Sequence, residues 1–223
     1  DDYSLTFIRD RLYKAGEYFV DASGKTKIAT TVYKVAETGG KYTFPSAVPW
    51  YGRPYKSVVF RDKISPENTG YWFCSPSGSA SKGCSYFDVS KLDTSKVIYM
   101  QNMFTGAGSS TSVQTFKIVG LDKWDTSNVT NMYSLFAGTG TSATTFDIGN
   151  LDKWDTSKVT TMYQMFQNTG KNAATWNVGN LSNWDTSKVT TMYQMFSYAG
   201  NNASTWSIGD ISKWDTSNVV NMD

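Results

Sequence analysis

Hydrophobic and polar positions along the chain recur with a period of 30 residues. LDKWDTSNVTNMYSLF begins at Leu121, LDKWDTSKVTTMYQMF at Leu151 and LSNWDTSKVTTMYQMF at Leu181. A further copy, ISKWDTSNVVNM, begins at Ile211, and a looser one, KLDTSKVIYMQNMF, begins at Lys91. Self-similarity at a fixed period is typical of repeat architectures, so the fold is expected to be a stack of these units.

The apolar side chains return at the same places in every copy, which marks them as core positions. In the four closer copies one such position holds only Trp, another only Val and a third only Met, whereas the looser copy has Leu92 at the Trp position. They are, in that order, Trp124, Trp154, Trp184 and Trp214; Val129, Val159, Val189 and Val219; Met132, Met162, Met192 and Met222. A solvent-facing position would not keep large apolar side chains so consistently.

Two shorter periods lie within each repeat. Phe146 and Ile148 alternate with polar residues, which favours a strand. Val159, Met162 and Phe166 are spaced by three and four, which suits a short helix, and Ser157 or Asp155 before them could cap it. One such unit cannot bury its own apolar face, whereas stacked neighbours can. We therefore predict an α/β solenoid, a leucine-rich-repeat-like stack of strand, corner and short helix.

The first quarter of the chain does not repeat. LTFIRD, KIATTVYKV and KYTFP are β-branched and aromatic runs separated by turn residues, which predicts a β-rich N-terminal cap over residues 1–56. A helix over Leu5–Lys14 is the alternative, because its apolar residues also have helical spacing. The solenoid is expected over 57–223, with a degenerate opening repeat at 57–85 and an incomplete last repeat whose parent array continues.

Composition narrows the functional classes. The net charge is +2, from 21 basic and 19 acidic residues, which is no electrostatic case for nucleic-acid binding. No apolar run is long enough for a membrane span. The chain has no His, the commonest general base, and no acidic pair interrupts the repeat pattern. We expect no catalytic residues, no cofactor and no metal.

WDTSNVTNMYSLF and WDTSKVTTMYQMF resemble the W-D-T-S-x-V-T-x-M-x-x-M-F repeats of the BspA-like leucine-rich-repeat surface proteins of bacteria. The resemblance is close over Lys91–Met222. Val58–Phe73 is similar to the first repeat of such proteins, and Ser4–Asp10 to their N-terminal strand. The resemblance implies export, a place on the bacterial cell surface, and adherence or host-protein binding. One departure is the period, because most leucine-rich repeats have about 20–29 residues.

The two cysteines are Cys74 and Cys84. In an exported protein this pair predicts a local disulfide, whereas in a cytosolic protein it would be two thiols.

An aspartate column precedes Thr-Ser in the repeats: Asp93, Asp125, Asp155, Asp185 and Asp215. Stacked carboxylates could bind Ca²⁺ between repeats. We favour the structural interpretation, in which each carboxylate accepts hydrogen bonds from nearby N–H groups at the corner.

Strand residues between the buried ones should face outwards. One outward column is uniform: Thr115, Thr145, Thr175 and Thr205. The next varies: Lys117, Asp147, Asn177 and Ser207. Variation on a fixed scaffold is what a recognition surface would show, and unconstrained drift would look the same.

A further candidate surface is the row Tyr133, Tyr163 and Tyr193. Such rings could stack on sugars or anchor a protein partner. The interpretation we favour is that they lie half-buried over the neighbouring repeat.

The sequence therefore predicts a secreted, non-catalytic bacterial surface protein that binds a host or matrix protein or a neighbouring-cell component. The alternatives are a module that binds a surface glycan and a structural spacer that displays a downstream domain.

Overall fold

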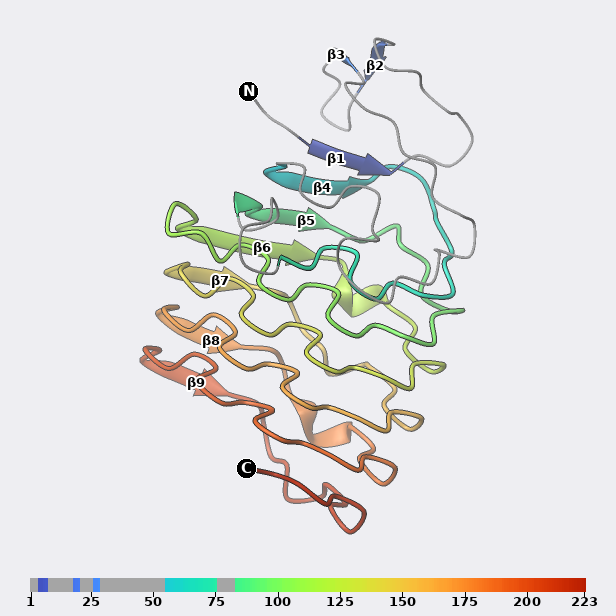
Figure 1. Ribbon diagram of the computed structural model, residues 1–223, viewed down its shortest axis with the longest axis vertical. Coiled ribbons are helices and arrows are strands. Elements are labelled where there is room, and N and C mark those ends of the chain that lie inside the picture. The colour runs from blue at the N-terminus through green and yellow to red at the C-terminus, as the bar shows by residue number, and fades with distance from the viewer. Residues whose placement is uncertain (1–3, 8–17, 21–25, 29–54, 76–82) are drawn as a thin grey trace.

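The computed structural model describes residues 4–7, 18–20, 26–28, 55–75 and 83–223, and it winds as a β-solenoid (Figure 1). Each turn of the solenoid contributes one short strand to a common parallel face. The strands of the larger sheet, in spatial order, are β1 (Ser4–Phe7), β4 (Ser57–Phe60), β5 (Tyr86–Asp88), β6 (Thr115–Val119) and β7 (Thr145–Asp147). β8 (Thr175–Asn177) and β9 (Thr205–Ser207) form a second parallel pair below them.

The strand prediction for the repeats is confirmed, and the register follows the 30-residue period. Phe116 pairs with Phe146, and Lys117 pairs with Asp147. Phe116 and the next inward residue, Ile118, are buried, whereas Lys117 is exposed. The corner after the strand contains a short 3₁₀ turn in two repeats, η3 (Leu121–Lys123) and η4 (Leu181–Asn183).

The prediction of a short helix in each repeat is wrong. The described residues contain no α-helix, and the segment from Val159 to Phe166 is a bridge residue followed by tight turns. Gln164 has a positive φ of 52°, which interrupts a right-handed helix. Its N–H donates across to the Tyr193 carbonyl of the next repeat, at 2.8 Å. The short helix of the predicted α/β repeat is therefore absent from the described repeats. An irregular turn segment with isolated β-bridges takes its place.

This turn segment is tied to its neighbours in every repeat. A line of isolated parallel bridges runs along it through Tyr99, Asn131, Thr161, Thr191 and Asn221. Glycines at the end of this segment adopt the left-handed conformation. Gly170 has a φ of 51°, and a Cβ there would lie 2.8 Å from the Phe146 ring. The spacing of three and four between the buried residues Val159, Met162 and Phe166 thus comes from successive tight turns beside the stacked aromatic rings.

Aromatic ladders fill the interior. Consecutive Trp rings of the repeats stack with centroids 5.9 Å apart between Trp124 and Trp154, and 6.3 Å apart between Trp154 and Trp184. The Trp154 indole also donates to the Leu121 carbonyl of the preceding repeat at 2.8 Å. Phe136 stacks on Phe166 at 5.6 Å. Each of these Trp and Phe rings therefore stacks on its own counterpart one turn away.

The N-terminal strand belongs to the solenoid sheet, although our domain boundary placed it in the cap. β1 pairs in parallel with β4, and Phe7 stacks on Phe60 at 4.3 Å. This confirms a strand at Leu5 over the helical alternative for the described residues 4–7. β2 (Tyr18–Val20) and β3 (Thr26–Ile28) form an antiparallel pair. KYTFP and most of KIATTVYKV lie outside the described residues.

Candidate binding surfaces

The outward strand positions form the first candidate surface. The uniform column and the varied column are exposed as predicted; together they comprise Thr115, Lys117, Thr145, Asp147, Thr175, Asn177, Thr205 and Ser207. Lys117 and Asp147 form an ion pair of 3.0 Å with both side chains 48% exposed. A pair this exposed contributes little to stability. Its groups are therefore free to exchange this contact for one with a ligand.

The varied column also has a local structural task. Asp147 accepts a hydrogen bond from the Gly149 N–H at 2.9 Å, and Asn177 accepts one from the Gly179 N–H at 2.8 Å. These bonds turn the chain out of the strand. The need for an acceptor explains Asp, Asn and Ser at this position, but it does not explain Lys117.

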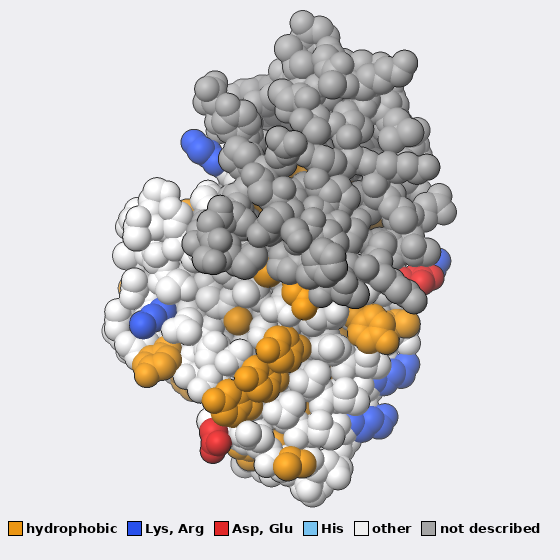
Figure 2. Space-filling view, in the orientation of Figure 1, with side chains coloured by type: hydrophobic (Ala, Val, Ile, Leu, Met, Phe, Trp, Pro, Cys, Tyr) orange, Lys and Arg blue, Asp and Glu red, His pale blue; other side chains and the backbone are white. Residues whose placement is uncertain are grey.

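The tyrosine row is the second candidate surface. Tyr133 and Tyr163 stack with centroids 4.8 Å apart, and Tyr163 and Tyr193 stack at 4.9 Å. The interplanar angles are 6° and 26°, so the rings cover each other's faces and leave edges and hydroxyls towards solvent. Tyr133 is 37% exposed, and the other two are half-buried over their neighbours, as we favoured. Figure 2 shows a continuous stripe of hydrophobic side chains on this side of the solenoid.

Electrostatics agrees with close packing in the row. Partial burial, followed by the neighbouring phenols of Tyr133 and Tyr193, raises the pKa of Tyr163. Burial is also the main cause that raises the pKa of Tyr71, to which Cys74 and Tyr133 contribute. The phenols of Tyr163 and Tyr71 are consequently neutral at physiological pH.

Sequence reasoning missed the residue that follows each tyrosine of the row. Ser134, Gln164 and Gln194 have φ values of 50°, 52° and 50°. Neither Ser nor Gln is typical of the left-handed region, so no residue type in the sequence could reveal this column.

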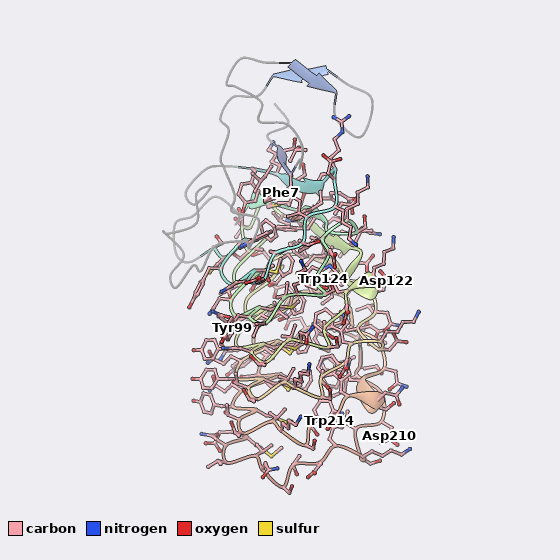
Figure 3. All side chains as sticks on the ribbon, turned by 90° about the vertical axis from the view of Figure 1, so that its right-hand side faces the viewer. Phe7, Tyr99, Asp122, Trp124, Asp210 and Trp214 are labelled. Carbon is pink, nitrogen blue, oxygen red and sulfur yellow. The ribbon has the colours of Figure 1, made fainter. Side chains whose placement is uncertain are left out.

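The aspartate column serves the corner, as we favoured. The Asp155 carboxylate accepts from the Ser157 N–H at 2.9 Å, and Asp185 makes the same contact with Ser187. Hydrogen bonds from the Ser157 hydroxyl and N–H lower the pKa of Asp155. The described residues contain no group of acidic, Cys or His side chains that could hold a metal ion. Figure 3 shows two other aspartates of the corner region, Asp122 and Asp210, on the outer side of Trp124 and Trp214.

Cys74 and Cys84 are separate thiols in the structure, in contrast to the disulfide that we expected. Both are buried, and the Cys84 thiol points at the Tyr86 carbonyl, 3.5 Å away. Burial raises the pKa of Cys74 to about 12, so the thiol is protonated and unreactive as a nucleophile.

Among the described residues, no helix is long and apolar enough to span a membrane.

A protein-family model described as "Mycoplasma protein of unknown function, DUF285" matches residues 79–207 and 170–223, more than half of the chain. The chain belongs to this family. Comparisons with curated proteins and with solved structures find no match. The matched range begins before β5 and includes all the WDTS corners.

Proposed function

We propose that this DUF285 chain is a non-catalytic module of a bacterial cell-surface protein, of the BspA-like leucine-rich-repeat type, that binds a protein of a host or a neighbouring cell. The resemblance of its WDTS repeats supports the surface location and the adhesive role. The interior is explained by packing, so recognition has to use exposed positions.

The observation that carries the proposal is the contrast between fixed and varied positions on one strand face. Lys117, Asp147 and Asn177 are exposed neighbours that differ in charge, while the Thr beside each one is constant. Solenoids bind partners through extended surfaces made from equivalent positions of successive repeats. A column that changes from basic to acidic to neutral offers a distinct pattern to a protein partner.

The geometry disfavours the glycan alternative at the tyrosine row. A sugar ring stacks on the face of an aromatic ring, but the face of Tyr163 is covered on one side by Tyr133 and on the other by Tyr193. Only ring edges and hydroxyls remain for a ligand along the middle of the row.

The test is a binding screen of the immobilised chain against extracellular-matrix proteins and glycans. The strand-face variant is Thr145→Arg with Thr175→Arg. The matched control is Asn128→Arg with Asn183→Arg, because both Asn residues are exposed at positions where other repeats carry Lys. We expect binding to a protein component that the strand-face variant loses and the control keeps.

Two results would contradict the proposal. Binding that survives both substitutions on the strand face would move recognition elsewhere. The absence of binding to every component by the folded chain would favour the spacer instead.

A further inference from the structure

The tyrosine row is a partly exposed aromatic surface that the proposed strand-face function does not use. Its three rings form one continuous stack, and Tyr99 is a further exposed ring on this side of the solenoid, at 42% exposure (Figure 3). Exposed aromatic side chains that gather in one patch are typical of interaction surfaces rather than of ordinary protein surface.

A strained backbone column lies directly beside the rings. Ser134, Gln164 and Gln194 each adopt the left-handed conformation, which costs a residue with a Cβ about 1 kcal/mol or more and costs glycine nothing. Nevertheless none of the three is glycine. The chain thus keeps a side chain where the backbone alone would favour having none.

Two of these side chains brace the stack. The Gln164 amide donates to the Gln194 amide oxygen at 3.0 Å, and the Gln194 amide donates to the Tyr193 hydroxyl at 3.1 Å. Such bonds between exposed or half-buried side chains add little to folding stability. The bond to the Tyr193 hydroxyl does hold that ring in one orientation, which lowers the entropy lost when a partner binds.

The surface carries no charge of its own. The Tyr column and the adjacent Ser and Gln column are all uncharged, so two copies of this surface can meet without repulsion between like charges. The raised pKa of Tyr163 keeps the middle phenol of the row neutral across the physiological range.

The spacing of the rings selects the partner. Tyr133, Tyr163 and Tyr193 are 4.8 and 4.9 Å apart, which is the distance between neighbouring strands. Residues on one face of a bound strand repeat at about 6.6 Å, and a helix advances about 5.4 Å per turn. A polyproline II segment advances about 9.3 Å per turn and would reach only alternate rings. Another β-solenoid has the same axial period.

We infer that the Tyr133, Tyr163 and Tyr193 row docks against the same row of a second copy of this chain. The three-ring row is compatible with a two-fold axis that passes beside Tyr163. Tyr163 then meets the partner's Tyr163, and Tyr133 meets the partner's Tyr193. In such an isologous contact each row covers the other, so no row is left for a third copy and the assembly closes as a dimer.

The contact is small. Three rings from each copy bury less than the roughly 800 Å² per partner of a stable interface. The dimer therefore forms at high concentration, as when chains stand side by side on a surface, and tethering raises the effective concentration further.

The experiment is analytical ultracentrifugation of the full chain from about 10 µM to about 1 mM, the range in which a weak contact is populated. The test variant is Tyr163→Gln, because Gln101 occupies the same position of an earlier repeat. The control is Tyr198→Asn, which removes an exposed tyrosine outside the row and places Asn where the preceding repeat has Asn168. We expect a monomer–dimer equilibrium that the control leaves unchanged and Tyr163→Gln weakens about tenfold or more.

A cross-linking measurement covers the case in which the test variant fails to fold. A chain with Tyr163→Cys should form a disulfide-linked dimer under mild oxidation, because the two-fold axis brings the two copies of this position together. A chain with Tyr198→Cys should form far less.

A chain that stays monomeric at the highest concentration overturns the inference. Equal dimer formation by Tyr163→Gln overturns it as well, and so does equal cross-linking at the two positions. The strand-face variant Thr145→Arg with Thr175→Arg should still dimerise, so failure of this inference and failure of the proposed function give different results.

Discussion

The inner repeats and the last repeat have nearly the same sequence but very different environments. Trp176 is fully buried, whereas its counterpart Trp206 is 44% exposed. Met192 is 5% exposed, whereas Met222 is 58% exposed. The residue type therefore does not determine burial here. A repeat becomes part of the core when another repeat covers it, which is the nearest-neighbour behaviour of solenoids.

The hydrogen bonds show the same contrast. The Thr156 hydroxyl of an inner corner donates to the Asp185 carbonyl of the next repeat at 2.9 Å, and the residue is buried. Thr216, its counterpart in the last repeat, is exposed. The WDTS corner is thus a device for joining repeats, and its contribution depends on a following neighbour.

The largest expected effect comes from the Trp ladder. Trp154→Ala removes a ring that stacks on Trp124 and Trp184 and leaves the Leu121 carbonyl without its indole donor. It should lower the free energy of unfolding by about 3–5 kcal/mol, measured by urea denaturation. Trp214→Ala should cost clearly less, because that ring is only half-buried and stacks on one Trp. Equal losses would contradict the dependence on neighbours.

A smaller effect is expected at the corner threonine. Thr156→Val keeps the shape but removes the buried hydroxyl that donates to the Asp185 carbonyl, so it should cost about 1–2 kcal/mol in the same denaturation assay. Thr216→Val serves as the matched control and should change the unfolding free energy very little. A large effect at Thr216 would show that the corner threonine acts within its own repeat.

The smallest effect concerns acid stability. Burial raises the pKa of Asp93. Hydrogen bonds from Ser95, Lys63 and Ser65 outweigh this effect and together hold the pKa well below the ordinary value. A lowered folded-state pKa stabilises the fold above the unfolded value of about 3.9, and this stabilisation is lost as pH falls further. Asp93→Asn should therefore lower the free energy of unfolding by about 1 kcal/mol at pH 7. The difference in unfolding free energy between variant and wild type should become smaller below about pH 3.

Asp215→Asn is the control for that titration. The Asp215 carboxylate is exposed and accepts from Ser217, whereas Asp93 has three residues as partners. Its effect at pH 7 should be smaller. Thermal unfolding measured between neutral and acid pH would check both, and a difference for Asp93→Asn that persists in acid would contradict the electrostatic cause.

Much of the architecture could be predicted because the core positions repeat. The period located the strands at Thr145 and Thr175 and placed the Trp, Val and Met columns inside. The turn segment could not be predicted in the same way. Apolar spacing of three and four is produced by a helix and also by successive tight turns around a column. The deciding feature is a positive φ at Gln164, and Gln carries no signal for it.

The candidate surfaces were predicted in part. Alternation gave the outward direction of Thr145 and Asp147 correctly, because a strand has only two faces. The tyrosine row was located as well, but its mutual stacking depends on the distance between repeats and on the amides beside it. The thiol state of Cys74 is a question of three-dimensional proximity, and sequence spacing does not answer it.

The claim that turn segments bond across repeats, and not along a helix, can be tested by detecting hydrogen-bond scalar couplings with nuclear magnetic resonance. We expect a coupling between the Gln164 amide nitrogen and the Tyr193 carbonyl carbon, because the Gln164 nitrogen lies 2.8 Å from the Tyr193 carbonyl oxygen. A coupling from Gln164 to the Thr160 carbonyl carbon would mean a helix in this segment and would contradict the claim.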